Sequence, residues 1–323
     1  MKNISIVIAL LLMSTFYSFA QADYINRAVE KNDTVIIRLK TMDGEFEWQK
    51  STDKTNWETL TGIENEIKFI ADQTTYFRVI STIEGCFPDT STLGIISVYD
   101  EMTDIDGNTY KTIQIGDQIW MAENLRVTHY PDGKPIFKAE ADSSWAYTDS
   151  LAFCWYKNDS ATYAWHNGAY YNWAAAMYGN KSSDLIPSTI QGVCPAGWHL
   201  PSDGEWQQME QDLGMSADVA SEEGWHGTNQ GPKLAGKIHL WKNGVLTAND
   251  QFGESGFNGL PTGDRTWDDG SIFYGVGVYG TWWSATEVKS QNIWTRYIQY
   301  DKIQIRRRYT YMWNGNSVRC VKD

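Results

Sequence analysis

Hydrophobic and polar positions alternate along the first third of the chain, in short runs separated by turn-forming residues. A strand places successive side chains on opposite faces, so this alternation is typical of half-buried β-strands. The clearest runs lie at residues 34–39, 46–49, 75–80 and 94–98. Several short strands at this spacing predict an all-β sandwich over residues 22–99.

A second alternating stretch, residues 104–125, lies on both sides of Gly116 and Asp117. Two alternating runs joined by a short turn that contains glycine predict a β-hairpin. The sandwich pattern ends near residue 99, and a single core seldom grows beyond roughly 250 residues. We therefore predict a second domain over residues 100–323.

The apolar positions adopt helical spacing after Ser202. Trp206, Met209 and Leu213 lie at i, i+3 and i+7 and predict one buried helical stripe. Ser202 and Glu205 form a capping box, in which each side chain satisfies a backbone N–H of the first turn. We therefore predict a helix over residues 202–213.

Residues 225–280 are rich in Gly, Asn, Asp and Trp and show no sustained periodicity, which predicts a long loop region. A short helix is predicted before it, at residues 169–177. Short closing strands are predicted after it, at residues 282–284, 293–300, 303–306 and 317–321. A loop of this length needs a function or support, and tryptophan packing is the expected support.

The first twenty residues have the features of a signal peptide in the usual order. Lys2 precedes the apolar run Ile4–Met13, and Ser18 and Ala20 supply the small residues that signal peptidase reads. We predict a signal peptide over residues 1–20 and an extracytoplasmic location: secreted, cell-surface or periplasmic. No later window offers about 18 consecutive apolar residues, so no membrane span is predicted.

The net charge of −13 disfavours binding to nucleic acid or anionic membranes, whose phosphates repel an acidic chain. The basic run Arg306–Arg308 is a local exception. Its neighbours Ile305 and Tyr309 favour a strand with mixed faces over a phosphate site. Aromatic residues make up 14% of the chain and include 16 Trp, which raises the question of sugar binding.

Phe46–Trp57 and Thr75–Val79 resemble the immunoglobulin-like modules of secreted bacterial surface proteins. The resemblance implies that Trp48 is the buried strand tryptophan. Modules of this kind are mostly spacers or adhesion units. A spacer or adhesion role is therefore expected for residues 22–99.

The rest of the chain carries a series of motifs in a fixed order: Asp104–Tyr110, Ile115–Arg126, Cys154–Asp159, Tyr171–Met177, Cys194–Trp206, Gly256–Gly263, Trp282–Thr286 and Ser317–Val321. Together they resemble the Fibrobacter succinogenes major paralogous domain family. The resemblance implies a surface-associated domain with a C-type-lectin-like α+β architecture. In that architecture two helices flank a small antiparallel sheet, with a long loop region above it.

The same resemblance implies a disulfide between Cys194 and Cys320, which an exported protein can retain. Cys86 and Cys154 are then either free or paired across the domains, and free thiols are favoured. The cysteines and histidines are too scattered along the sequence for a zinc site. No cofactor is therefore predicted, with calcium as the one alternative.

The calcium alternative rests on the loop Asp104–Asn108, because alternate carboxylates followed by glycine can wrap a hard cation. Ile115 stands where an EF-hand needs a bidentate Glu, so a plain turn is favoured. Sugar-binding C-type lectins also use a Glu-Pro-Asn-type triplet, which this sequence lacks. In the triplet Trp313–Gly315, a glycine replaces the final carboxylate of the lectin pattern.

A ligand site, where one exists, is predicted within residues 225–283. Sugar binding needs flat apolar faces for the rings and planar polar groups for the hydroxyls. The candidate ligand-binding residues are Trp241, Trp267, Asp268, Asp269 and Trp282. For each Trp, core packing is the favoured alternative.

No catalytic residue is predicted. The capping box explains Glu205, and Cys154 has no identifiable His and Asp partners. We predict an exported, non-enzymatic recognition or adhesion protein whose partner is a glycan or a cell-surface protein. The alternatives are a secreted polysaccharide-acting enzyme, for which Glu254 and Asp268 or Asp269 supply candidate carboxylates, and a structural surface component.

Overall fold

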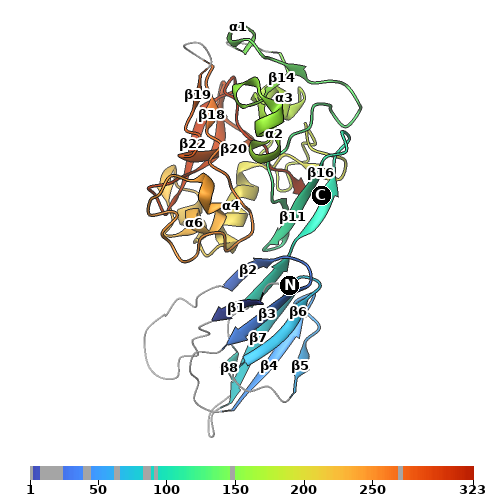
Figure 1. The fold of residues 1–323 in the computed structure, drawn as a ribbon, viewed down its shortest axis with the longest axis vertical. Helices are drawn as coiled ribbons and strands as arrows, with labels where there is room; N and C mark the ends of the chain where they lie inside the picture. The colour runs from blue at the N-terminus through green and yellow to red at the C-terminus, as the bar shows by residue number, and fades with distance from the viewer. Residues whose placement is uncertain are drawn as a thin grey trace. The chain divides into compact units, whose positions relative to one another are not determined.

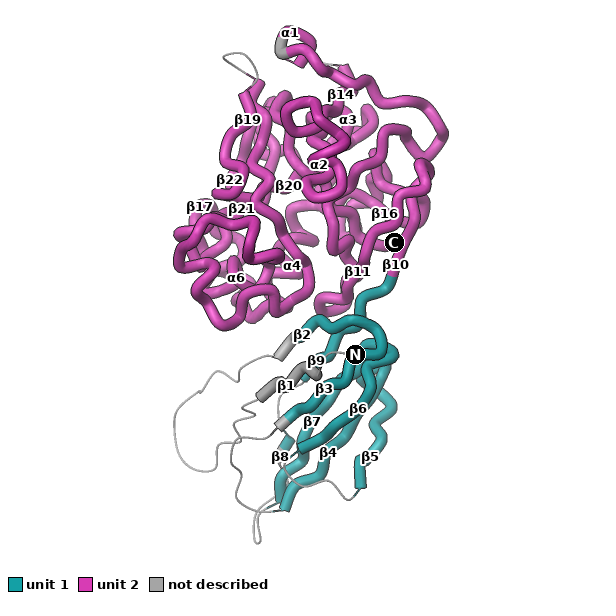
Figure 2. Tube along the Cα trace, in the orientation of Figure 1, with its two compact units in different colours: residues 1–100 teal, residues 101–323 magenta. Residues whose placement is uncertain are grey.

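The computed structural model describes residues 3–7, 25–38, 45–61, 66–82, 89–90, 94–145, 150–267 and 272–323. The chain divides into two compact units, Met1–Asp100 and Glu101–Asp323 (Figure 2). The predicted signal peptide lies outside the described residues except for residues 3–7, which form a strand. Within the described ranges, no helix has both the length and the apolar character needed to cross a membrane.

The described part of the first unit contains strands and no helix (Figure 1). One sheet has the order β2-β9-β7-β4-β5, with β8 paired to β7, and the other has the order β1-β3-β6. The strands of the larger sheet are β2 (Ile25–Val29), β4 (Glu45–Ser51), β5 (Glu58–Leu60), β7 (Thr75–Thr82), β8 (Asp89–Thr90) and β9 (Gly94–Val98). Those of the smaller sheet are β1 (Asn3–Val7), β3 (Asp33–Arg38) and β6 (Glu66–Ala71).

Both sheets of the first unit contribute to one core. Val35 and Ile67 come from the smaller sheet, and Trp48, Val79 and Ile96 come from the larger one. Trp48 is fully buried, as the resemblance of residues 46–57 implied. The two sheets therefore face each other, while the immunoglobulin-like identity of this unit stays a prediction.

The second unit contains several sheets. One has five strands in the order β10-β11-β12-β23-β16 and another has four in the order β17-β22-β21-β20. Their bounds are β10 (Asp100–Thr103), β11 (Thr109–Ile115), β12 (Gln118–Met121), β16 (Trp198–His199), β17 (Gly224–His226), β20 (Tyr279–Lys289), β21 (Asn292–Gln299), β22 (Ile305–Tyr311) and β23 (Val321–Lys322). Two small sheets consist of β13 (Phe137–Lys138), β14 (Ala152–Cys154) and β15 (Tyr170–Tyr171), and of β18 (Asp264–Arg265) and β19 (Phe273–Tyr274).

The helices of the described residues are all short. They are α1 (Asp142–Trp145), α2 (Ser160–Asn167), α3 (Trp173–Met177), α4 (Asp203–Asp212), α5 (Ala217–Ala220) and α6 (Gln230–Leu234), with 3₁₀ turns at Tyr156–Asn158 and Ile238–Leu240. The capping box of α4 is confirmed: Ser202 Oγ accepts from the Glu205 N–H at 3.2 Å, and Glu205 Oε2 accepts from the Ser202 N–H at 2.9 Å. Helix α4 packs on β20 and β21.

The predicted C-type-lectin-like α+β architecture, with two helices and one small sheet, is wrong. The second unit is mostly β, because the closing strands β20, β21 and β22 are long and form a sheet of their own with β17. The predicted helix over residues 169–177 is also shorter than expected. Tyr170 and Tyr171 pair with β14, and their hydroxyls donate to the carbonyls of Thr262 and Val127.

The predicted disulfide between Cys194 and Cys320 is confirmed, with 5.9 Å between the two Cα atoms. It lies beside the antiparallel pair of β16 and β23, in which His199 faces Val321. Cys154 is free and buried, and burial raises the pKa of its thiol to about 11. Cys86 lies outside the described residues.

Aromatic packing supports the long segment between residues 225 and 280, as predicted. Trp120, Trp206, Phe257 and Trp282 are fully buried, and neighbouring rings of this group lie 4.7 to 6.3 Å apart. The buried Arg319 adds a polar tie, because its guanidinium donates to the carbonyls of residues 121, 257 and 258. The segment therefore has a fixed course although it contains little regular structure.

Candidate functional site

Two of the predicted ligand-binding tryptophans lie inside the second unit. Trp282 is 0% exposed and donates from Nε1 to Asn124 Oδ1 at 2.9 Å. Trp241 is 5% exposed and donates from Nε1 to the Gly236 carbonyl at 2.9 Å. Neither indole has a face open to a ligand, so their positions support the packing alternative. Asp268 and Asp269 lie outside the described residues.

Trp267 lies instead in a partly exposed cluster of three rings, which we call the aromatic platform: Trp267, Tyr311 and Trp313. The Trp267 ring centroid is 5.2 Å from that of Tyr311 and 5.5 Å from that of Trp313. Tyr311 and Trp313 are nearly parallel, with an interplanar angle of 23°. Tyr311 is 46% exposed, and the two indoles are partly buried. The platform thus presents flat apolar surface to solvent.

The backbone brings these distant residues together. Strand β22 ends at Tyr311, and the next turn is closed by the Asn314 N–H donating to the Tyr311 carbonyl at 3.0 Å. Gly315 and Arg265 then exchange two backbone hydrogen bonds of 2.7 and 2.9 Å. This bridge places the segment after β18, which carries Trp267, beside the segment that carries Trp313.

Gly315 permits this close approach. A Cβ atom at residue 315 would meet the indole of Trp145 at 2.7 Å and the Cβ of Tyr170 at 3.1 Å. Arg265 packs on the same indole: its guanidinium lies 4.8 Å from the Trp145 ring and donates to the Ala139 carbonyl at 2.9 Å. The backbone that carries the aromatic platform is therefore held in place by buried contacts of Gly315 and Arg265.

The sequence analysis missed Tyr311 and Trp313 as members of this cluster. It ended the strand at residue 306 and treated Trp313 only as part of a metal-binding triplet. Aromatic residues two positions apart at a strand end were the available signal, because such side chains lie on the same side of an extended chain.

The loop Asp104–Asn108 is a turn closed by its own carboxylates. Asp104 Oδ1 accepts from the N–H groups of Asp106 and Asn108, both at 2.9 Å, and Oδ2 accepts from the Tyr110 hydroxyl at 2.6 Å. Asp106 Oδ1 lies 2.6 Å from His129 Nδ1. Burial raises the pKa of Asp106, but hydrogen bonds from Thr128 and His129 outweigh it and lower the pKa below its usual value.

These contacts hold residues 104–108 as a closed turn. Nowhere in the described part of the chain do three or more His, Cys, Asp or Glu side chains cluster so that they could hold a metal ion. The geometry of residues 104–108 thus supports the turn that the sequence analysis favoured.

The acids of α4 form a buried ion network. Arg296 Nη1 lies 2.6 Å from Asp203 Oδ1, and Arg307 Nη2 lies 2.9 Å from Asp203 Oδ2. Burial raises the pKa of Asp203, but the two arginines outweigh it and lower the pKa to about 2. Glu210 binds Arg296 through Oε1 and lies 3.3 Å from His226 Nε2 through Oε2. The network joins α4 to β21 and β22.

Glu205 and Glu254 are also inside the unit. Glu205 Oε1 lies 2.7 Å from His199 Nε2, and Oε2 accepts from the Ser188 and Ser202 N–H groups. Burial lowers the pKa of His199, but hydrogen bonds to Glu205 and Asp323 outweigh it and raise the pKa. Glu254 is 5% exposed. Glu205 is therefore committed to the helix start, whereas Asp268 and Asp269, the candidate partners of Glu254, lie outside the described residues.

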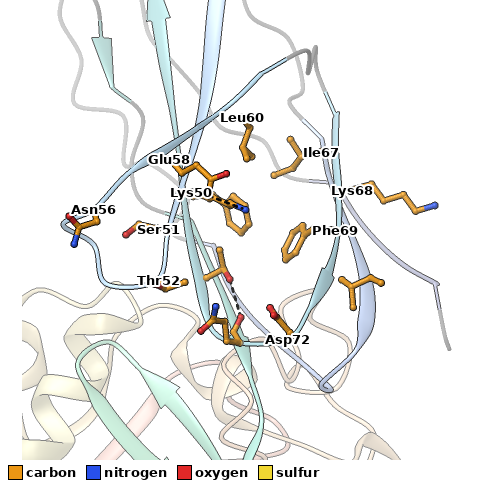
Figure 3. A pocket seen from close by; sticks show the side chains of 14 residues that line it. Lys50, Ser51, Thr52, Asn56, Glu58, Leu60, Ile67, Lys68, Phe69 and Asp72 are labelled. Atoms are coloured by element: carbon orange, nitrogen blue, oxygen red, sulfur yellow. Dashed lines mark hydrogen bonds and ion pairs between the residues drawn. The ribbon is translucent and has the colours of Figure 1, made fainter.

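The first unit contains a cavity of about 530 Å³ between strands of its two sheets (Figure 3). Leu60, Ile67 and Phe69 line its apolar inner surface. Lys50 and Glu58 form an ion pair of 3.3 Å at its edge. Polar side chains, among them Ser51, Asn56 and Asp72, complete its lining.

Comparison with known proteins divides the chain at nearly the same place as its structure. The family model described as the Fibrobacter succinogenes major domain matches residues 113–322. A model described as a domain of unknown function (DUF8696) matches residues 26–100. No curated protein and no solved structure matches the chain.

Proposed function

The chain belongs to the Fibrobacter succinogenes major domain family, and on that basis we propose that it is an exported, non-enzymatic recognition or adhesion protein that binds a glycan at the aromatic platform. The observation that carries the proposal is the partly exposed cluster of Trp267, Tyr311 and Trp313. One face of a pyranose ring is largely C–H, and such a face packs on an aromatic ring.

The support under the platform also favours binding. Gly315 and Arg265 hold the two ring-bearing segments through paired backbone hydrogen bonds. A preorganised surface loses little conformational entropy when a ligand binds, so more of the contact energy appears as affinity.

Export is part of the proposal and is supported by the leader pattern. Lys2, the apolar run Ile4–Met13 and the small residues Ser18 and Ala20 follow the order of a signal peptide. A structural disulfide such as Cys194–Cys320 is typical of proteins outside the reducing cytoplasm.

A non-enzymatic role is supported by the state of the conspicuous acids. Asp203, Glu205 and Glu210 are buried in ion pairs and capping hydrogen bonds. A glycosidase needs two carboxylates that flank the scissile bond about 5 to 10 Å apart in an accessible cleft. The acids of this network are instead used to join α4 to the sheet.

A glycan array of the purified mature protein, run with calcium and again with chelator, tests the proposal. We expect selective binding of a neutral glycan that is unchanged by chelation and is lost in Tyr311→Ala and Trp313→Ala. Trp165→Ala is the matched control, because Trp165 is 62% exposed on α2, outside the platform. Binding of the neutral glycan that persists in both platform variants, or hydrolysis of a bound glycan, would overturn the proposal.

A further inference from the structure

The basic run Arg306–Arg308 is divided between the two faces of β22. Arg307 faces α4, where it binds Asp203 and lies 3.6 Å from the ring centroid of Trp294. Strand geometry directs its two neighbours to the opposite face. The run is therefore a strand with mixed faces, and Arg306 and Arg308 are available for another role.

On that opposite face, five residues form what we call the basic–aromatic patch: Trp225, Tyr297, Lys302, Arg306 and Arg308. Arg306 lies directly between Trp225 of β17 and Tyr297 of β21 in the register of the sheet. Its guanidinium is 5.7 Å from the Trp225 ring centroid, and that of Arg308 is 4.4 Å from the Tyr297 ring centroid. Lys302 Nζ is 5.9 Å from the Trp225 ring.

The aromatic rings of the patch hold the cations in place. Trp225 and Tyr297 contact each other with centroids 5.7 Å apart, and Tyr279 packs on Tyr297 at 4.6 Å. A cation over an aromatic face is attracted by the ring quadrupole, which restricts the flexible side chain. Trp225, Lys302, Arg306 and Arg308 remain partly exposed, so an incoming group can reach the charges.

The positive charge of the patch is only partly compensated. Asp264 lies 3.4 Å from Arg308 Nη2 and also accepts from the Tyr279 hydroxyl at 2.8 Å. Arg306 forms no ion pair within the described ranges of the chain, and nearby Asp301 accepts from Gln299.

Some N–H donors of the two arginines also have no acceptor. The Nε atoms of both Arg306 and Arg308 are buried without a hydrogen-bond partner. The two guanidinium groups leave the same strand face two residues apart, about 7 Å along the strand. Like charges at this spacing repel each other, and a bound anion relieves the repulsion. In a chain with a net charge of −13, such a patch is unusual.

We propose that the basic–aromatic patch binds the carboxylate of a uronic acid unit in an acidic polysaccharide. The planar fork of an arginine matches a carboxylate with two parallel N–H···O bonds. Arg306 supplies the uncompensated fork, while Arg308 and Lys302 add attraction. The choice of a saccharide rests on the proposed glycan recognition, whereas the preference for an anion rests on the charges of the patch alone.

The test is calorimetric titration of the purified full chain with a short oligogalacturonate. We expect binding that weakens as salt is added, because partly exposed charges are screened. Arg306→Gln and Arg308→Gln should each weaken it about tenfold or more, since charged hydrogen bonds are among the stronger ones. Lys181→Gln, which removes an exposed cation elsewhere, should leave it unchanged, and so should Tyr311→Ala.

Three further probes separate the sources of the anion. A neutral galacto-oligosaccharide should not bind at the patch, and sulfated dextran and poly-L-glutamate should bind more weakly than the oligogalacturonate. Equal affinity of Arg306→Gln and the parent chain would overturn the inference, provided that both have the same unfolding temperature. Tighter binding of sulfated dextran or poly-L-glutamate would overturn the uronate assignment. Loss of oligogalacturonate binding in Arg306→Gln supports the patch even where Tyr311→Ala has no effect on any glycan.

Discussion

Arg296 Nε lies 2.5 Å from Glu210 Oε1, and the two side chains are 1% and 0% exposed. This pair joins β21 to α4. Arg296→Met would remove the guanidinium that both acids share, which leaves buried Glu210 with only His226 at 3.3 Å, while Asp203 keeps Arg307. Breaking a buried pair from one side costs about 3–5 kcal/mol. Urea unfolding should show a loss of this size in Arg296→Met. The control Lys289→Met removes an exposed cation from β20 and should change stability by less than about 0.5 kcal/mol.

Acid should destabilise the second unit through Asp203. Its pKa is about 2 in the folded chain against 3.8 as the ordinary value, so the folded state favours the ionised form. The stabilisation is therefore fully present above about pH 4. It should be lost as the pH falls from 4 towards 2, and it amounts to about 2 kcal/mol.

Unfolding free energies measured between pH 5 and pH 2 check this. The parent chain should lose more stability across that range than Asp203→Asn, which lacks the carboxyl and is less stable at pH 5 already. If the unfolding free energies of the two chains fell equally with pH, the acid sensitivity would not come from Asp203.

Trp282 and Tyr311 should respond to substitution in opposite ways. Trp282→Ala opens a cavity in the cluster with Trp206 and Phe257 and should cost about 3–5 kcal/mol. Tyr311 is 46% exposed, so Tyr311→Ala should cost less than about 1 kcal/mol while abolishing the binding of a neutral glycan at the aromatic platform. Thermal unfolding measures the loss of stability, and the glycan array measures the loss of binding. A stable Trp282→Ala with lost binding would place the ligand inside the present core.

Removing the disulfide should destabilise the second unit. The bridge closes a loop whose ends are separated by 126 residues. In the chain-entropy treatment, a closed loop of about this length is worth roughly 4–5 kcal/mol. Cys194→Ser with Cys320→Ser should lose about 2–5 kcal/mol in urea unfolding. A reducing agent should destabilise the parent chain and have no effect on this double variant.

The sequence predicted the helix start and the hairpin because each depends on residues that are close together in the chain. Ser202 and Glu205 are three residues apart, and their capping box starts α4 as expected. The hairpin on both sides of Gly116 is also confirmed, with Ile115 facing Gln118. The fold class depended on pairings between distant segments, such as β17 with β22. No periodicity within either segment specifies that pairing. The sequence therefore gave no sign that the architecture implied by the resemblance was wrong.

The candidate site was only partly predictable for the same reason. Composition marked residues 225–283 as rich in tryptophan but did not distinguish a buried ring from an exposed one. Trp282 faces Arg296 across the sheet and lies under α4, whereas Trp267 follows a strand end. Whether a tryptophan ring is buried or exposed depends on how its segment pairs with a neighbouring strand. The neighbours of Trp267, which are Tyr311 and Trp313, become visible only in three dimensions.

Arg319 and Cys320 are consecutive, and each fastens a different part of the second unit. Arg319 holds the carbonyls of residues 257 and 258, and Cys320 holds Cys194. Both follow almost every other element in the order of synthesis, whereas the core of the first unit is complete by Val98. Domains generally fold as units, beginning at the N-terminus. During synthesis, therefore, the first unit can fold before the second is complete, whereas the second unit needs its last strand before it can close.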